Sequence, residues 1–368
     1  MYIIVMCRRC FFAKIAETYK IFLINTNKKD EGLMVNIDIG IDLGTCNTVI
    51  YIKDKGIVVN QPSIVAYEVK TKKIIAVGVK AKKMIGKTPE GIEVVSPIVK
   101  GVISNYTLTE RMIKAYVRNA IEQRKIWGKP TICVCVPSGV TQVEKKAACD
   151  AVFRTGARKV YVLEEPYAAA IGTNVDIDSP KGHMFVDIGG GTTDIAVVTK
   201  GAISISKSVK VASGDFDEAI IKYIRRKYSV LLGNMSAEQL KIEIGAVYPR
   251  EQDAVGYAKG KELMKGLPTK FPVHSSEIEE ATGEVADMIV EAIKQVLENT
   301  PPELVNDIAE FGIVLSGGGS KIYGMDKLIE DKTGVRVRKI ENPELVVATG
   351  AGTARKYVAD EVVVTSDV

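Results

Sequence analysis

The sequence predicts an α/β protein whose fold is duplicated, with two similar halves on either side of a cleft. Segments typical of strands and of helices alternate along the chain, as they do in α/β architectures. One opening pattern occurs twice, at residues 37–53 and at residues 183–199: an apolar strand with aspartate near its end, a glycine-rich turn and a second strand. The length of 368 residues fits about two domains of ordinary size.

In the first half, short apolar runs predict strands, and apolar residues at helical spacing predict helices. Two of these runs flank Gly-Thr-Cys-Asn, which indicates a β-hairpin. The expected strands cover residues 37–43, 48–53, 57–59, 63–67, 74–77, 131–136 and 159–163. The expected helices cover residues 108–126, 143–153 and 166–172.

The second half repeats this order around another glycine-rich turn. Its expected strands cover residues 183–188, 195–199 and 311–315, and the last strand leads into Gly317-Gly318-Gly319. The expected helices cover residues 215–228, 237–247, 276–299 and 322–332. Two halves with the same beginning predict a duplicated fold, with inserted material forming smaller subdomains.

The composition argues against several classes of protein. There are 50 Lys and Arg residues against 45 Asp and Glu residues, and this net charge of +5 is small for a dedicated nucleic-acid-binding protein. Six cysteines in a chain of this length do not indicate a disulfide framework. His183 and His274 are the two histidines, which leaves little material for a histidine-based triad or zinc site. No apolar run is long enough to predict a transmembrane helix.

Residues 1–33 lack the periodic pattern that begins after Met34. They contain short apolar runs interrupted by charges and no cleavage site of small residues, so they do not resemble a signal peptide. We expect either a mis-assigned start or a loosely attached extension that the fold does not need. A basic, amphipathic segment that lies on a membrane surface is the alternative.

The two glycine-rich turns carry groups suited to phosphate. Asp42 and Asp187 each come at the end of a predicted strand, and glycines and hydroxyl side chains follow them. Backbone N–H groups and hydroxyls bind phosphate oxygens, and carboxylates bind Mg²⁺, often through its waters. A single turn of this kind is equally typical of a tight hairpin that needs glycine for positive φ. Two copies favour phosphate held between two hairpins, since neither a Walker A motif nor GxGxxG spacing is present.

The order of these motifs resembles the actin and heat-shock chaperone ATPase superfamily and, within it, the bacterial actin family of MreB and Mbl. The segments that carry the resemblance are Ile39–Thr45, Met84–Pro89, Gly156–Arg158, Glu164–Pro166, Val186–Thr193, Lys241–Gly245, Gly266–Pro268, Thr300–Leu304 and Leu315–Gly319. The resemblance covers roughly residues 37–358 and implies a duplicated actin-like (ribonuclease H-like) ATPase fold. The implied domains are an extension over residues 1–36, a first lobe over 37–170 plus about 340–358 with an insertion at about 66–98, a second lobe over 171–339 with an insertion at about 207–275, and a tail over 359–368.

The resemblance also implies roles for particular residues in binding ATP with Mg²⁺. The residues at positions that contact nucleotide are Thr45, Cys46, Asn47, Gly190, Gly191, Thr192, Glu238, Gln239, Leu240, Lys241, Gly318, Gly319, Ser320 and Lys321. Asp42 and Asp187 match the pair that binds Mg²⁺ through water, and Glu165 and Thr192 match the pair that positions the hydrolytic water. A carboxylate can orient water and accept its proton. Taken alone, Glu164-Glu165-Pro166 is equally typical of a helix N-terminus.

The function implied by the resemblance is that of a membrane-associated bacterial actin-like cytoskeletal protein. Such a protein polymerises with ATP into filaments that organise cell-wall synthesis and maintain rod shape. Its expected partners are further copies of the chain, the inner leaflet of the cell membrane and membrane proteins of the wall-elongation complex, and its expected place is the inner face of the membrane. A small-molecule kinase and a chaperone-type ATPase of the same fold are the alternatives, although the sequence shows neither a second substrate pocket nor a chaperone's substrate-binding domain.

One loop suits a lipid surface. Ile126 and Trp127 form an apolar pair flanked by Lys125 and Lys129, and Trp127 is the only tryptophan in the chain. Aromatic rings favour the headgroup region, and cations favour anionic lipid. The resemblance implies the same role, because the matching loop of the family carries a bulky apolar pair that inserts into the bilayer. The alternative is a tryptophan folded back over its own helix.

Overall fold

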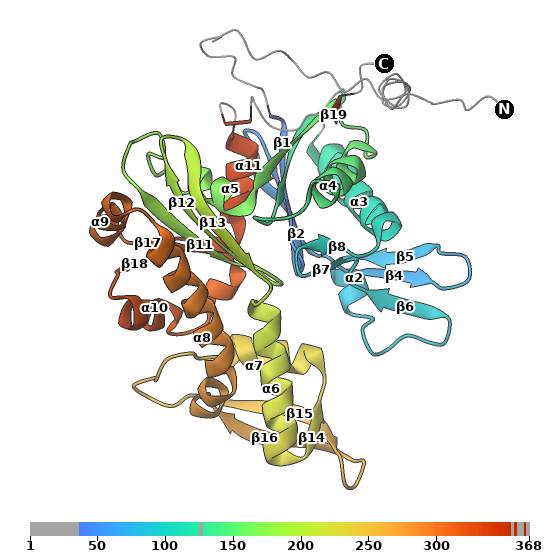
Figure 1. The fold of residues 1–368 in the computed structure, drawn as a ribbon. Helices are drawn as coiled ribbons and strands as arrows, with labels where there is room; N and C mark the ends of the chain where they lie inside the picture. Colours follow the sequence, from blue (N-terminus) through green and yellow to red (C-terminus); the bar gives the residue numbers. More distant parts are fainter. Residues whose placement is uncertain (1–36, 125–127, 355–356, 359–363, 366–368) are drawn as a thin grey trace, which may run out of the picture. The chain divides into compact units, whose positions relative to one another are not determined.

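The computed structural model describes residues 37–124, 128–354, 357–358 and 364–365. In Figure 1, these residues form two larger β-sheets with helices packed on them and smaller sheets beyond. The six-stranded sheet has the order β19-β10-β9-β1-β2-β3. Its strands are β1 (Ile39–Leu43), β2 (Asn47–Ile52), β3 (Gly56–Pro62), β9 (Thr131–Val136), β10 (Lys159–Glu164) and β19 (Val364–Thr365).

The five-stranded sheet repeats the topology of the first sheet. Its order is β13-β12-β11-β17-β18, and its strands are β11 (His183–Ile188), β12 (Thr193–Thr199), β13 (Ala202–Val209), β17 (Ile313–Ser316) and β18 (Val337–Lys339). β1 pairs antiparallel with β2 and parallel with β9, and β11 pairs in the same way with β12 and β17. The predicted duplication of an α/β fold is therefore confirmed at the level of strand pairing.

Two short helices, α5 (Glu165–Gly172) and α11 (Val346–Thr353), pack against each other between the two sheets. They share a buried cluster with strands of both sheets, including Cys133 of β9 and Phe185 of β11. The helices approach so closely that a Cβ atom on Gly350 would lie 1.8 Å from the carbonyl oxygen of Ala168. Glycine is therefore needed at this crossing for lack of space.

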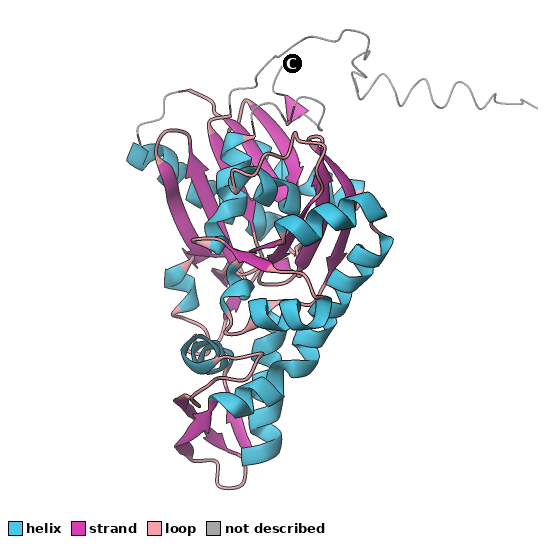
Figure 2. Cartoon of the chain, turned by 90° about the vertical axis from the view of Figure 1, so that its left-hand side faces the viewer, coloured by secondary structure: helices cyan, strands magenta, loops and turns pink. Residues whose placement is uncertain are grey.

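The remaining helices flank the sheets (Figures 1 and 2). They are α2 (Val79–Lys82), α3 (Tyr106–Arg124), α4 (Gln142–Phe153), α6 (Ser213–Tyr228), α7 (Asn234–Ile244), α8 (Ser275–Asn299), α9 (Pro302–Phe311), α10 (Met325–Thr333) and the 3-10 helices η1 (Gly318–Lys321) and η2 (Pro343–Leu345). Among the described residues, no helix is long and apolar enough to span a bilayer.

Three small sheets complete the described part of the chain. They are β14 (Val230–Leu232) with β15 (Val255–Glu262) and β16 (Pro268–His274), β4 (Val65–Glu68) with β5 (Ile74–Val77) and β6 (Ile92–Val95), and the hairpin of β7 (Ile98–Val99) with β8 (Val102–Ile103). The first two lie within the segments where insertions were expected, whereas the hairpin begins at the edge of one of them.

Several boundaries differ from the predictions for local reasons. The strand expected over residues 311–315 begins at Ile313, because Phe311 ends α9 and Gly312 adopts a φ of 97°. The helix expected over 322–332 begins at Met325, after Gly324 with a φ of 82°. The expected tail includes β19, which pairs with β10. The extension over 1–36 and the pair Ile126-Trp127 lie outside the described residues.

Candidate functional site

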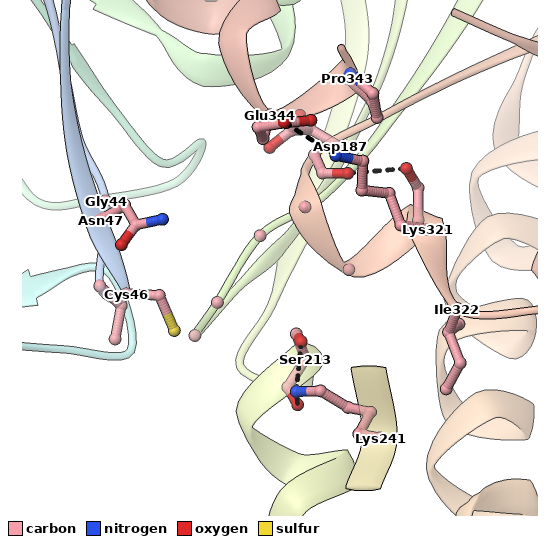
Figure 3. A pocket seen from close by; sticks show the side chains of 18 of the residues that line it. Gly44, Cys46, Asn47, Asp187, Ser213, Lys241, Lys321, Ile322, Pro343 and Glu344 are labelled. Carbon is pink, nitrogen blue, oxygen red and sulfur yellow. Dashed lines mark hydrogen bonds and ion pairs between the residues drawn. The ribbon is translucent and has the colours of Figure 1, made fainter. Parts of the chain in front are cut away.

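A cavity of about 780 Å³ lies where the two glycine-rich hairpins meet. Figure 3 shows Cys46 and Asn47 on one side of this cavity and Lys241 and Lys321 on the other. Its walls contain most of the residues that the sequence singled out: Asp42, Thr45, Cys46, Asn47, Glu165, Asp187, Gly190, Gly191, Thr192, Glu238, Lys241, Gly318, Gly319, Ser320 and Lys321. Residues that are far apart in the sequence are thus brought to one cavity.

The tips of the two hairpins touch each other. A Cβ atom on Gly190 would lie 2.3 Å from Cys46 Sγ, and a Cβ atom on Gly191 would lie 2.6 Å from Thr45 Oγ1. Neither glycine has a positive φ. The turn therefore needs glycine here because the opposite hairpin leaves no room for a side chain. In an isolated hairpin, glycine would instead be needed to adopt a positive φ.

Three neighbouring acidic side chains line the cavity, and a fourth, Asp194, lies close to them. Burial, together with the charge of Asp187, raises the pKa of Asp42 to about 8. Burial raises the pKa of Asp187 to about 6, even though Ser316 Oγ donates a hydrogen bond of 2.6 Å to its Oδ1. Burial, with the charges of Asp194, Asp42 and Asp187, raises the pKa of Glu165 well above its usual range.

Asp194, the fourth acid, pairs with Asp187 across the second hairpin. Burial raises its pKa to about 7, although the backbone N–H of Ser138 donates to its Oδ1 at 2.8 Å. Such a group of acids disfavours further negative charge and favours a cation. Asp42 and Asp187 offer the hard oxygen ligands that Mg²⁺ prefers, so the donor set fits this ion. Among the described residues, no three acidic, histidine or cysteine side chains are placed to hold a metal on their own.

Helix α7 presents one face to the cavity. Glu238, Lys241 and Ile242 line it, and their spacing of three and four residues is that of one helical face. Leu240 is buried in the core beneath α7, and Gln239 is exposed and donates to Glu243 at 2.8 Å. Neither of these two lines the cavity, because four consecutive residues of a helix cannot all face one side.

Lys241 is fixed by a network at the start of α6. Its Nζ donates to the carbonyl oxygen of Ser213 at 2.9 Å, to Ser213 Oγ at 2.8 Å and to Asp217 Oδ2 at 3.0 Å. Glu238 forms an ion pair of 2.7 Å with Lys82 of α2. The cavity wall made by α7 is therefore tied to elements on both sides of it.

The third glycine run packs against the end of β11. Gly317 has a φ of 85°, and a Cβ atom there would lie 2.2 Å from the carbonyl oxygen of Ile188. Ser320 Oγ donates to the carbonyl oxygen of Gly317 at 2.7 Å and so closes the turn of η1. Lys321 forms an ion pair of 2.8 Å with Glu344. The third glycine run thus forms one wall of the cavity, with Gly319 and Ser320 buried in it.

Sequence reasoning missed several side chains in the cavity. Ile242 lines it while its side chain is exposed, and the guanidinium of Arg250 lies 4.0 Å from the ring centroid of Tyr323. The helical spacing from Glu238 could have identified Ile242. No local pattern could have identified Arg250 or Tyr323, which lie 73 positions apart in the sequence.

A family model and the curated relatives of this chain point to the same protein family. A family model described as MreB/Mbl protein matches residues 36–362. The cell shape-determining protein Mbl of Bacillus subtilis is 44% identical over 315 residues, which is 86% of this chain and 94% of the relative. The cell shape-determining protein MreB of Escherichia coli K12 is 42% identical over 335 residues, which is 90% of this chain and 96% of the relative.

Solved structures are similar over most of the chain. MreB5 of Spiroplasma citri bound to ADP has a TM-score of 0.82 and 35% identity, with 86% of this chain and 95% of that chain covered. The same protein bound to AMPPNP has a TM-score of 0.81 and 34% identity, with the same coverage. A MamK double helical filament, with 22% identity and a TM-score of 0.72, supports the actin-like fold. None of these relatives supports the alternatives of a small-molecule kinase or a chaperone-type ATPase.

Proposed function

Because this chain belongs to the MreB/Mbl family, we propose that it binds ATP with Mg²⁺ in the cavity between its hairpins and assembles into filaments that maintain cell shape. The observation that carries this proposal is the meeting of two glycine-rich hairpins around buried acids. The similar structures of Spiroplasma citri MreB5 contain ADP and AMPPNP, which supports a nucleotide in the cavity.

We assign the phosphate-binding role to the two hairpin turns. The backbone N–H groups of residues 45–47 and 190–192 would bind phosphate oxygens, as turns rich in small residues do. Glu238 and Lys241 would contact the nucleoside, and the run from Gly318 to Lys321 would lie along the base or ribose. Asp42 and Asp187 would hold Mg²⁺ through water, and this ion would neutralise charge on the phosphates.

Glu165 is the residue that we propose to act on water. It begins α5 and lines the cavity, and it is 7% exposed. A carboxyl group whose pKa is raised toward or above neutrality is a stronger base once it is ionised. Thr192, also buried, lies on the second hairpin, where it would hold the same water. ATP hydrolysis would then depend on placement more than on covalent chemistry.

The Glu165→Gln variant tests this assignment. We expect it to bind ATP with near wild-type affinity and to release phosphate at a rate lower by about two orders of magnitude or more. Glu144→Gln is the matched control, because Glu144 caps α4 through Thr141 and does not line the cavity. Nucleotide affinity, phosphate release and ATP-dependent pelleting are measured on the same samples. Phosphate release at the wild-type rate by Glu165→Gln would refute the role of this residue.

We further propose that filaments lie on the inner face of the cell membrane and bind membrane proteins that elongate the wall. Ile126 and Trp127 are the proposed lipid contacts, and they follow α3, whose last residue is Arg124. A single loop binds lipid weakly, but a filament repeats it and attachment then gains from avidity.

Trp127 fluorescence with anionic liposomes and ATP tests this membrane proposal. A blue shift that needs both filaments and lipid is expected. An unchanged emission maximum, or full co-sedimentation of an Ile126→Ser/Trp127→Ser variant with liposomes, argues against the loop as the lipid contact.

We also propose that the two lobes have the limits expected from the sequence, residues 37–170 plus about 340–358 and residues 171–339. The two large sheets support this division, since β1, β9 and β10 belong to one sheet and β11 and β17 to the other. A nucleotide bound between the lobes would then favour a closed arrangement of them. Small-angle scattering with and without ATP measures this closure.

A further inference from the structure

The hairpin turn between β7 and β8 contacts both glycine-rich hairpins. Lys100 and Gly101 form this turn with φ values of 47° and 75°, as a two-residue turn with two left-handed positions requires. The N–H of Gly101 donates to Thr45 Oγ1 at 2.9 Å. A Cβ atom on Gly101 would lie 2.5 Å from Pro137 Cγ and 2.9 Å from Thr192 Cγ2. The turn therefore packs directly on side chains from the first and the second hairpin.

Lys100 joins this turn to the start of α6. Its Nζ lies 2.9 Å from Asp215 Oδ1 and 3.0 Å from the carbonyl oxygen of Lys210. The other oxygen of Asp215 accepts the N–H of Ala212 at 2.9 Å, in the first turn of α6. The ammonium group thus binds a helix start that is already fixed by its own capping interaction.

The start of α6 is in turn bonded to the second hairpin. The N–H of Ser213 donates to the carbonyl oxygen of Gly189 at 3.2 Å, and the N–H of Gly214 donates to that of Gly190 at 2.9 Å. The contacts form a closed ring that runs from the turn to the second hairpin, to α6 and back through Lys100. If the ion pair breaks, the turn loses its anchor on α6 and keeps its contacts with the two hairpins and with Pro137.

We propose that Lys100 is a positioning residue, which holds the β7–β8 turn against Thr45 and Thr192 and so keeps Thr192 placed for ATP hydrolysis. This inference rests on the proposed function, because it assumes that ATP is hydrolysed in the cavity. The side chains of Lys100 and Asp215 are 43% and 20% exposed. An ion pair this exposed adds little to stability, so its effect is expected on placement instead.

A second ion pair next to the cavity provides a comparison. Lys82 of α2 and Glu238 of α7 are 2.7 Å apart. Lys82 has no hydrogen bond or ion pair with either hairpin among the contacts of the described residues. Breaking this pair is therefore expected to affect nucleotide binding, with little effect on the hydrolysis of nucleotide already bound.

The experiment measures single-turnover hydrolysis of bound ATP and the Kd for ATP in Lys100→Ala, Lys100→Arg, Asp215→Asn and Lys82→Ala. Lys100→Ala is expected to hydrolyse bound ATP about tenfold more slowly, since small misplacements have large effects on rate. Its Kd is expected to change by less than about fivefold, the limit set by one exposed ion pair. Lys100→Arg keeps the cation and is expected to retain most of the wild-type rate. Lys82→Ala is expected to show the reverse, a raised Kd with a near wild-type rate.

Asp215→Asn keeps the capping oxygen and removes the charge, so it is expected to match Lys100→Ala. The double variant Lys100→Ala/Asp215→Asn is then expected to be no slower than either single variant. Wild-type hydrolysis by Lys100→Ala, equal losses in Lys100→Ala and Lys100→Arg, or additive losses in the double variant would each overturn this inference. A wild-type chain that does not bind or hydrolyse ATP would instead refute the proposed function.

Discussion

Replacing Gly190 with alanine tests how closely the two glycine-rich hairpins approach each other. The added Cβ atom would lie 2.3 Å from Cys46 Sγ, 2.6 Å from Cys46 Cβ and 3.1 Å from the backbone nitrogen of Cys46. Rotation of the cysteine side chain can move Sγ away, but it cannot move Cβ or the backbone. The hairpins must therefore separate, and the separation widens the proposed phosphate-binding site between them.

The size of the effect follows from these contacts. Forcing one methyl group into a packed site costs about 1–3 kcal/mol. If the whole penalty falls on the closed arrangement that binds nucleotide, the Kd for ATP rises by about 5-fold to 150-fold. Cys46→Gly removes both clashing side-chain atoms, so the double variant Cys46→Gly/Gly190→Ala is expected to recover most of the lost affinity. Titration calorimetry with ATP and Mg²⁺ measures all three variants.

Gly283→Ala is the control for this experiment. Gly283 lies within α8, nothing is within 4 Å of the position of its Cβ atom, and its φ is not positive. The substitution is expected to leave the Kd unchanged and to stabilise the helix slightly, because alanine has the higher helix propensity. Wild-type affinity in Gly190→Ala, or the same loss with and without Cys46→Gly, would show that the tips do not restrain each other.

Three further predictions follow from packing and charge. Gly350→Ala is expected to lower the free energy of unfolding by about 3 kcal/mol or more, because its Cβ atom would overlap the carbonyl oxygen of Ala168. Urea denaturation measures this loss, and an unchanged midpoint of unfolding contradicts the packing of α5 on α11. The pKa values of Asp42 and Asp187 are raised to about 8 and about 6, so the folded protein without nucleotide binds more protons than the unfolded chain. Its melting temperature is therefore expected to fall as the pH rises from about 5 to about 8, and Asp187→Asn is expected to make this fall smaller. A melting temperature that rises over this pH range refutes the prediction. A chain that starts at Met34 is expected to melt with ATP at the same temperature as the full chain, and a clearly lower temperature would show that residues 1–33 stabilise the fold.

Local patterns in the sequence predicted the main elements of the fold well. The strands at residues 131–136 and 183–188 have the predicted limits, because continuous apolar runs bounded by turn residues specify buried strands. The missed elements include the helix α9, the strands β13, β15 and β16, and the short helix α11. β15 and β16 alternate exposed residues with buried or partly buried ones, and α11 is a short run of small residues that resembles a loop. Their structure depends on the neighbours that they pack against.

The candidate site was predictable as far as its residue types went. Two copies of aspartate followed by glycines and hydroxyls indicated phosphate and a cation, and the resemblance to MreB and Mbl supplied the remaining positions. The prediction that four consecutive residues of α7 contact the nucleotide was too broad, since only Glu238 and Lys241 of the four line the cavity. The helical period corrects it and adds Ile242.

By itself, the sequence determined that the chain has two similar halves, that each carries a hairpin with an acidic strand end, and that the net charge is small. These properties are set by residues near one another in the chain, where apolar periodicity and turn chemistry act. Only the tertiary structure decided that Gly190 lies against Cys46, that Lys100 reaches Asp215, and that four acids share one buried site. Gly190 and Cys46, and likewise Lys100 and Asp215, are at least 115 positions apart in the sequence. Their contacts depend on how the two sheets pack on α5 and α11. Packing of that kind is fixed by the close fit of whole surfaces, which no local pattern records.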